Sequence, residues 1–170
     1  MEVIILQGQL SQKEQMLLED LKKEEDLCVV KYQGYAQQTQ DSQLSQLFNK
    51  IAGDEQRHYD TVNQLLQSGG VGQAGMPGKH GSQSGQQQGQ GGGQGGSQGG
   101  GGQGAVSSDK HMLHDMLSTE KYVSSAYDTG VFESAQSNVR KALQQIQQDE
   151  QNHGEQLFQY MSSHGMYQVQ

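Results

Sequence analysis

The chain has 170 residues and a formal net charge of −8, and 31% of its residues are hydrophobic, with no tryptophan. Because no cluster of lysine or arginine interrupts this acidity, repulsion from phosphate backbones is expected to exclude nucleic-acid binding. So few apolar residues can fill only a narrow core, which favours an amphipathic helical bundle over a layered α/β domain.

The first residues of the sequence are not expected to act as an export signal. The apolar run Val3–Leu6 is too short for a signal peptide, and it follows the acidic Glu2. No stretch approaches the roughly 20 apolar residues that cross a bilayer, so we expect no membrane span. The single cysteine, Cys28, rules out an intramolecular disulfide and is interpreted as a small buried hydrophobe. These features together predict an intracellular protein.

Two segments have the periodicity of helical hairpins. Residues 11–67 contain no proline, and their apolar residues recur at helical spacing with a polar break at residues 37–41, which predicts two helices and a tight turn. Residues 109–167 repeat this arrangement. The spacing predicts an inward-facing apolar stripe on each helix, and these stripes include Tyr35, Leu47, Ala142 and Tyr160.

The segment between the hairpins has a different composition. Residues 68–108 hold 18 of the 24 glycines, together with many glutamines and serines. Such a segment cannot bury enough apolar surface to offset its ordering entropy, so we expect a long, disordered linker. Either a passive tether or a glutamine-rich segment that attaches to a larger assembly is compatible with this composition.

The second hairpin is a copy of the first. Shifting it back by 95 positions aligns identical residues, among them Glu25 with Glu120, Tyr32 with Tyr127, Glu55 with Glu150, and His58 with His153. Ser42 and Ser137 also align where the second helix of each hairpin should begin, so both are predicted to be N-caps.

Ionisable residues interrupt the apolar stripe of all four predicted helices. In each hairpin the first helix carries a glutamate and the second carries Glu-x-x-His, and thirty residues separate the two glutamates, with the turn near the midpoint. Folding a hairpin antiparallel therefore brings its glutamates to one level. The residues expected to converge are Glu25, Glu55, His58, Glu120, Glu150 and His153.

This set of side chains predicts a metal site. Unpaired carboxylates in an apolar core cost several kcal/mol each, and two divalent cations would balance four of them, with two neutral imidazoles as further ligands. One glutamate from each of two helices and Glu-x-x-His from the other two is the ligand set of di-iron and di-manganese bundles. We therefore expect two transition-metal ions, with iron or manganese favoured and zinc compatible. The alternative is a metal-free polar layer, or a solvated helix face that repeats because half of the gene was duplicated.

Two tyrosines are candidates for a supporting role. Tyr32 and Tyr127 each lie seven residues after a glutamate of the predicted site, two turns along the same helix face. There a phenol could hydrogen-bond a carboxylate or donate an electron. A purely structural core aromatic is equally compatible with this spacing.

The second half of the chain contains three characteristic stretches, Leu117–Tyr122, Asp149–Gly154 and His164–Tyr167, and the first half matches them more loosely through Glu25, Tyr32 and Asp54–His58. With these stretches the second half resembles the coat F domain of endospore-forming bacteria, within the ferritin-like superfamily that includes rubrerythrins and bacterial ferritins. The resemblance implies an all-α, ferritin-like four-helix bundle in the spore coat, or in the forespore or mother cell. Its partners would be other coat proteins or itself.

Three functions follow from these observations. We favour a spore-coat or spore-associated protein whose metal site stabilises or protects. The second is a di-iron or di-manganese oxidoreductase with peroxidase, ferroxidase or catalase activity. In it the bridging ligands would be Glu55 and Glu150, and the terminal ligands Glu25 with His58 and Glu120 with His153. The third is a metal-free structural bundle. A flexible linker would also permit a homodimer by hairpin exchange.

Overall fold

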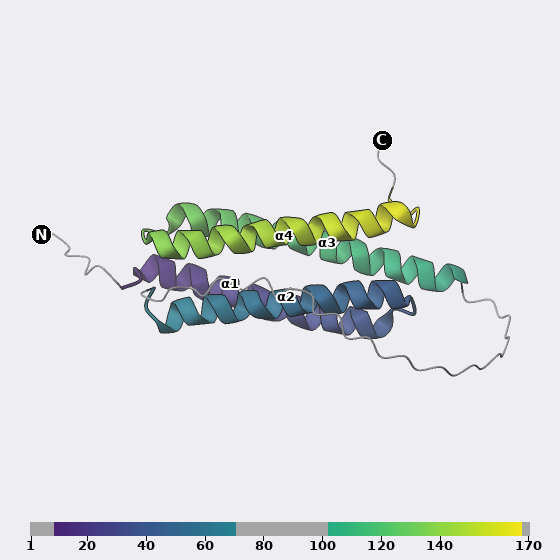
Figure 1. Ribbon diagram of the computed structural model, residues 1–170, viewed down its shortest axis with the longest axis horizontal. Helices are drawn as coiled ribbons and strands as arrows, with labels where there is room; N and C mark the ends of the chain where they lie inside the picture. The colour runs from purple at the N-terminus through teal and green to yellow at the C-terminus, as the bar shows by residue number, and fades with distance from the viewer. Residues whose placement is uncertain (1–8, 71–101, 168–170) are drawn as a thin grey trace, which may run out of the picture.

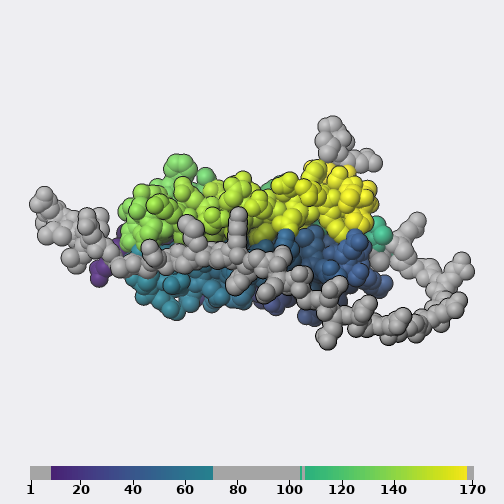
Figure 2. Space-filling model, viewed as in Figure 1, coloured from purple at the N-terminus to yellow at the C-terminus, as the bar shows by residue number. Residues whose placement is uncertain are grey.

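The computed structural model describes residues 9–70 and 102–167, which fold into four α-helices arranged as two hairpins (Figure 1). The helices are α1 (Gln12–Gln38) and α2 (Ser42–Gln67), then α3 (Gly102–Glu133) and α4 (Ser137–Ser163). α1 packs against α3, and α2 lies beside α4, as Figure 2 also shows. The predicted all-α bundle of two hairpins is confirmed. Within the described ranges, no helix combines sufficient length with sufficient apolar character to cross a bilayer.

The predicted linker, residues 68–108, overlaps the start of the third helix. α3 begins at Gly102, inside the range 68–108. After α2, Gly69 and Gly70 adopt positive φ angles of 61° and 85°, a left-handed conformation that glycine adopts without strain, and so they close the helix. Residues 71–101 lie outside the described part of the chain, so the division into hairpin, linker and hairpin stays a prediction.

The N-caps of α2 and α4 are one residue earlier than predicted. Asp41, not Ser42, caps α2, and its carboxylate accepts two backbone N–H bonds at 2.7 and 3.1 Å. Gln136, not Ser137, occupies the N-cap position of α4, and its side chain makes no capping bond. An ionised carboxylate is a stronger acceptor than a hydroxyl, which favours the aspartate as the cap.

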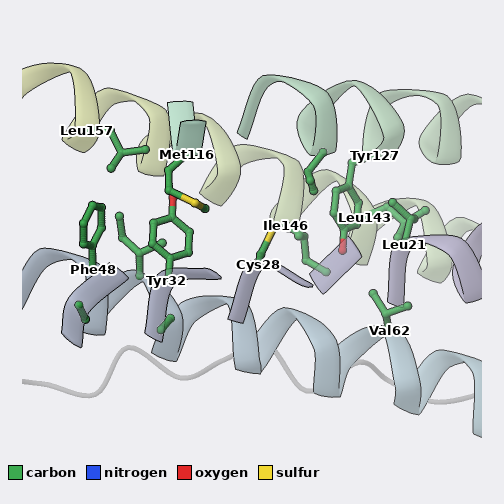
Figure 3. Packing of buried hydrophobic residues seen from close by; sticks show 14 of the residues in the cluster. Leu21, Cys28, Tyr32, Phe48, Val62, Met116, Tyr127, Leu143, Ile146 and Leu157 are labelled. Atoms are coloured by element: carbon green, nitrogen blue, oxygen red, sulfur yellow. The ribbon is translucent and has the colours of Figure 1, made fainter. Parts of the chain in front are cut away.

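A continuous apolar core runs through the bundle (Figure 3). Four residues predicted to face inward are only partly buried, and at each the next residue is buried instead: Ala36 for Tyr35, Phe48 for Leu47, Leu143 for Ala142 and Met161 for Tyr160. A helix has 3.6 residues per turn. Counting at that pitch from the buried glutamate of each helix leads to the residues that the structure buries.

The buried side chain of Glu14 links the start of α1 to the other hairpin through hydrogen bonds. Ser11 and Glu14 form a capping box, in which the Glu14 carboxylate accepts a bond of 2.8 Å from the Ser11 N–H. The second carboxylate oxygen accepts bonds from the backbone N–H groups of Ala135 at 2.9 Å and Gln136 at 3.2 Å. One acidic side chain therefore joins the start of α1 to the loop between α3 and α4.

The register between the hairpins is set along α1 and α3, which run antiparallel. Lys13 near the start of α1 pairs with Glu133 at the end of α3. Lys31, toward the other end of α1, lies 2.7 Å from Asp115 in α3. Since each hairpin is itself antiparallel, this register brings the buried glutamates of all four helices to one level.

Candidate metal centre

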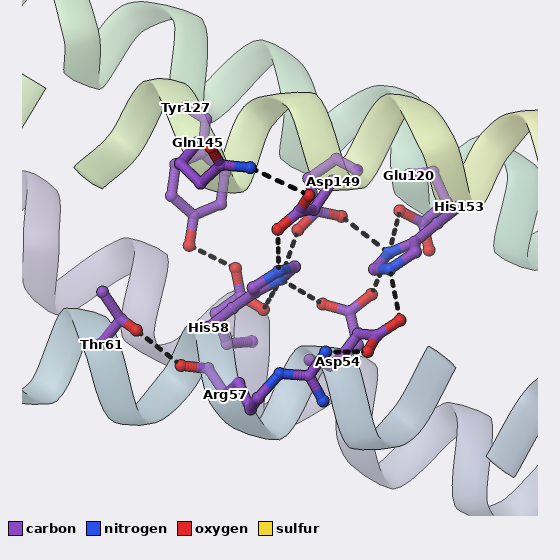
Figure 4. Close-up of polar contacts among 12 residues, drawn as sticks. Asp54, Arg57, His58, Thr61, Glu120, Tyr127, Gln145, Asp149 and His153 are labelled. Carbon is purple, nitrogen blue, oxygen red and sulfur yellow. Dashed lines mark hydrogen bonds and ion pairs between the residues drawn. The ribbon is translucent and has the colours of Figure 1, made fainter. Parts of the chain in front are cut away.

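A single layer inside the bundle contains the six residues predicted to converge, and each is at most 3% exposed. α1 and α3 contribute Glu25 and Glu120, while α2 and α4 contribute the two Glu-x-x-His sequences. They are buried because each lies on the inward stripe of its helix. Figure 4 shows several of these side chains pointing from the two hairpins toward the centre of the bundle.

The imidazole of His58 faces carboxylates from three helices. Its Nδ1 atom lies 3.0 Å from Glu150 and 3.3 Å from Glu55. Glu25 is slightly further away, at 3.7 Å. One ring nitrogen on α2 is therefore close to carboxylate oxygens from α1, α2 and α4.

His153 repeats this arrangement from the second hairpin. Its Nδ1 atom lies 3.0 Å from Glu55, 3.7 Å from Glu120 and 3.8 Å from Glu150. The rings of His153 and His58 stack, with centroids 5.6 Å apart. The internal repeat of the sequence is thus a repeat of the local geometry.

Two groups of ligand atoms can be distinguished in this layer. Within each group, one atom from every residue lies within 4.8 Å of the others. The first group is Glu25, Glu55, His58 and Glu150, and the second is Glu55, Glu120, Glu150 and His153. Glu55 and Glu150 belong to both groups, as carboxylates that bridge two neighbouring cations would.

Several polar atoms of this layer are buried without a hydrogen-bond partner. They are Oε2 of Glu25, Oε1 of Glu55, Oε2 of Glu120, both carboxylate oxygens of Glu150, and Nδ1 of His153. Buried polar atoms are nearly always satisfied, and leaving one unpaired costs about 1–3 kcal/mol. Carboxylates with imidazoles form a donor set that suits first-row transition metals. The residues present therefore fit a pair of such ions.

Burial and mutual repulsion divide the four glutamates into two kinds. Burial raises the pKa of Glu25 and of Glu120 well above the usual value, and nearby carboxylates add to this effect. Burial also opposes ionisation of Glu55 and Glu150. Close contacts with the imidazoles of the two histidines outweigh it, so the pKa of Glu55 falls to about 2 and that of Glu150 is lowered. The two shared carboxylates are thus the ones most readily ionised.

Two aspartates that were not predicted from the sequence contact the outer nitrogens of the histidines. His58 Nε2 lies 3.4 Å from Asp149, and His153 Nε2 lies 3.4 Å from Asp54 (Figure 4). Each aspartate belongs to the opposite hairpin. Its contact holds the ring so that Nδ1 is directed at the carboxylates. The repeated Asp-Glu-Gln sequence was the available signal, because the aspartate recurs beside the glutamate in both halves.

Tyr32 and Tyr127 donate hydrogen bonds into the layer, and each does so across the hairpin boundary. The Tyr32 hydroxyl donates to Glu120, and the Tyr127 hydroxyl donates to Glu25. Burial, followed by the charge of these glutamates, raises the pKa of both phenols well above the usual value, so both stay protonated donors. The acceptor is the glutamate of the opposite hairpin, not the one seven residues earlier.

Cys28 lies beside this layer and is 1% exposed. Burial, together with the neighbouring glutamates, raises the pKa of its thiol, so it stays neutral. In Figure 3 its sulfur lies among apolar side chains, close to Ile146. The interpretation of Cys28 as a small buried hydrophobe is confirmed.

A bundle of two repeated hairpins with this buried layer between them has the fold of ferritin-like proteins. One solved structure that it resembles is a two-domain protein from Anabaena variabilis with DJ-1/ThiJ/PfpI-like and ferritin-like domains. The TM-score is 0.65 at 12% sequence identity, and the match covers 96% of this chain but 40% of that one. At this identity, the likeness concerns the fold alone.

The family match lies in the second hairpin. Residues 108–170 match the model of the Coat F domain, in agreement with the resemblance seen in the sequence. The first hairpin lies outside the matched range. No curated protein gives a significant sequence match.

Proposed function

We propose that this chain is a spore-coat or spore-associated protein whose ferritin-like bundle binds two transition-metal ions between its hairpins. The Coat F domain over residues 108–170 supports the location. The two ligand groups that share Glu55 and Glu150 support the metal site and carry the proposal. Without cations, these buried carboxylates would remain uncompensated.

Each residue of the layer would have a definite part. The terminal ligands would be Glu25 with His58 for one ion and Glu120 with His153 for the other, and the bridging ligands would be Glu55 and Glu150. The ions would neutralise the buried acidic layer and act as Lewis acids; iron or manganese is favoured and zinc is compatible. Asp54 and Asp149 would hold the imidazoles, and the surrounding core would exclude water.

Elemental analysis tests the metal site directly. Full-length protein purified without added metal, and the same protein after loading with Fe(II), Mn(II) or Zn(II), should retain up to two ions per chain. The double variant Glu55→Ala, Glu150→Ala should lose both ions, because it removes both shared ligands. The matched control is Gln56→Ala, Gln151→Ala, which alters the exposed neighbours of the same residues and should bind as wild type. A wild-type chain that retains no metal after loading would support the metal-free bundle instead.

The location has a separate test. Antibodies raised against the chain should detect it in purified spores of the organism that encodes it, together with the coat proteins that we expect as partners. Detection in growing cells only would contradict this part of the proposal and would leave the metal site unaffected.

A redox enzyme is the second candidate, and the two tyrosines favour it. Tyr32 and Tyr127 donate hydrogen bonds to Glu120 and Glu25, the predicted terminal ligands, where a phenol can hold or supply a proton. Metal-loaded protein should then oxidise Fe(II) or consume hydrogen peroxide faster than the Glu55→Ala, Glu150→Ala variant. Equal rates in the two proteins would leave only the stabilising role.

A further inference from the structure

The exposed apolar side chains of the bundle gather on two of its helices. Six large ones on α1 and α3 are 51–82% exposed: Met16, Leu27, Val30, Val106, Tyr122 and Phe132. Among the residues that the structure describes, α2 and α4 expose no large apolar side chain. The face seen in Figure 2, where α2 and α4 lie side by side, therefore differs in character from the face formed by α1 and α3.

The centre of the α1–α3 face is apolar. Leu27 and Tyr122 occupy equivalent positions of the repeat, 95 residues apart. Lys31 of α1 donates a hydrogen bond of 2.9 Å to Thr119 of α3. Leu27 lies one turn before Lys31, and Tyr122 lies one turn after Thr119; because the helices are antiparallel, both steps run in the same direction. This register places them opposite each other. Val30, 60% exposed, extends the same surface, and these three residues are called the central patch.

Ion pairs within the chain accompany the central patch on the same two helices. They are Lys13 with Glu133, Lys23 with Asp20, and Lys31 with Asp115. Because these charges are balanced inside one chain, another protein can approach without meeting unpaired charge at these positions. An apolar centre with a polar, charged rim is the usual anatomy of a protein interface.

We propose that the α1–α3 face is a homodimer interface, and that a second copy of this chain covers it. Two of the three patch residues, Leu27 and Tyr122, occupy equivalent positions on antiparallel helices. A two-fold dimer pairs one such surface with the same surface of a second copy. The face is about 40 Å long and about 20 Å wide, from the dimensions of two adjacent helices of this length. That area, about 800 Å² per chain, is what a standard stable interface buries on each partner.

This dimer differs from one formed by hairpin exchange. Here each chain keeps both of its hairpins, and with them a complete set of the six buried site residues. The association therefore does not depend on metal binding, and it can be tested on protein with or without metal.

The test is the mass of the full-length protein in solution, measured by sedimentation and light scattering over a range of micromolar concentrations. The wild type should have twice the 18.6 kDa mass of one chain. The variant Leu27→Lys, Tyr122→Lys should be monomeric, with the dimer weakened about a hundredfold or more. The matched control is Gln46→Lys, Gln144→Lys, which makes the same charge change at exposed positions of α2 and α4 and should remain dimeric.

Circular dichroism establishes that each variant is as helical as the wild type. If the lysine variant is not, Leu27→Ser, Tyr122→Ser replaces it and should also weaken the dimer. A wild type that is monomeric throughout the range would overturn the proposal. Persistence of the dimer in folded patch variants would also overturn it, and would point to hairpin exchange or to another face.

Discussion

Glu14, in the first turn of α1, accepts a hydrogen bond of 2.9 Å from the backbone N–H of Ala135, 121 residues further along the chain. Burial alone would raise the pKa of this carboxyl. Backbone and side-chain hydrogen bonds from Ser11, together with those from the loop at Gln136 and Ala135, instead hold the pKa below its usual value of 4.5. Because the pKa is lower in the folded than in the unfolded chain, the ionised form stabilises the fold above about pH 4.5 and is lost as pH falls through the folded value.

Replacing Glu14 with glutamine should therefore change how stability depends on pH. We expect Glu14→Gln to lower the free energy of unfolding by about 1–3 kcal/mol at neutral pH, because three partly buried backbone N–H groups lose a charged acceptor. Urea denaturation at neutral pH and near pH 3.5 should show that Glu14→Gln loses less free energy of unfolding on acidification than the wild type does. The control Glu19→Gln alters an exposed carboxyl of the same helix and should behave as wild type. An equal acid-dependent loss in Glu14→Gln and wild type would contradict this role.

Removal of metal should lower the melting temperature of the loaded protein. Cations that bind only the folded state stabilise it by about 2.7 kcal/mol at a hundredfold excess over the dissociation constant. Thermal unfolding followed by circular dichroism, before and after chelation, measures the shift. Glu55→Ala, Glu150→Ala should melt at the same temperature under both conditions. An unchanged melting temperature in wild type, after measured loss of its ions, would show that metal does not stabilise the bundle.

The aspartates behind the histidines should tune metal affinity without being ligands. Asp149→Asn should weaken binding about 10- to 100-fold, because the contact with Nε2 of His58 loses its charge. Asp54→Asn should have a similar effect through His153. Titration against a competing chelator gives the affinities, with the exposed Asp26→Asn as control. If both variants bind metal as tightly as the wild type, the two aspartates do not contribute to metal affinity.

Two helical glycines should respond differently to alanine. A Cβ atom at Gly53 would meet nothing within 4 Å, whereas at Gly130 it would lie 3.0 Å from a methyl group of Leu143 and 3.5 Å from one of Leu21. We expect Gly53→Ala to stabilise the protein by about 0.5–1 kcal/mol through helix propensity. Gly130→Ala should gain less, because Leu143 must move. Urea denaturation of both variants decides the comparison, and a larger gain at Gly130 would contradict it.

The layer of six buried residues could be predicted from the sequence because its signals are local and repeated. The thirty-residue spacing of Glu25 and Glu55 follows from the length of two helices and one turn, and the same spacing recurs in the second half. Burial of these side chains is what the structure adds. Their role as metal ligands stays a prediction.

The contacts between hairpins were harder to predict. Helical periodicity states which face of a helix is buried, but it does not state which residue of another hairpin will lie opposite. The bond from Tyr32 to Glu120, the contact of Asp149 with His58, and the attachment of Glu14 to the distant loop all depend on that pairing. Four inward residues, at positions 35, 47, 142 and 160, were wrong by one position for a simpler reason. The spacing of three or four residues used to count along a helix departs from its pitch of 3.6 residues per turn, and the departure displaced these four positions.

Each group of ligand atoms takes three residues from one hairpin and one glutamate from the other. Glu150 of the second hairpin belongs to the first group, and Glu55 of the first hairpin belongs to the second group. A protein with a single hairpin of this kind would contain only three residues of one ligand group, and it would have to associate with a second molecule to complete the group. Placing both halves in one polypeptide replaces that bimolecular encounter with a high effective concentration. After duplication of the hairpin, assembly of the six-residue site would therefore no longer depend on the concentration of the protein.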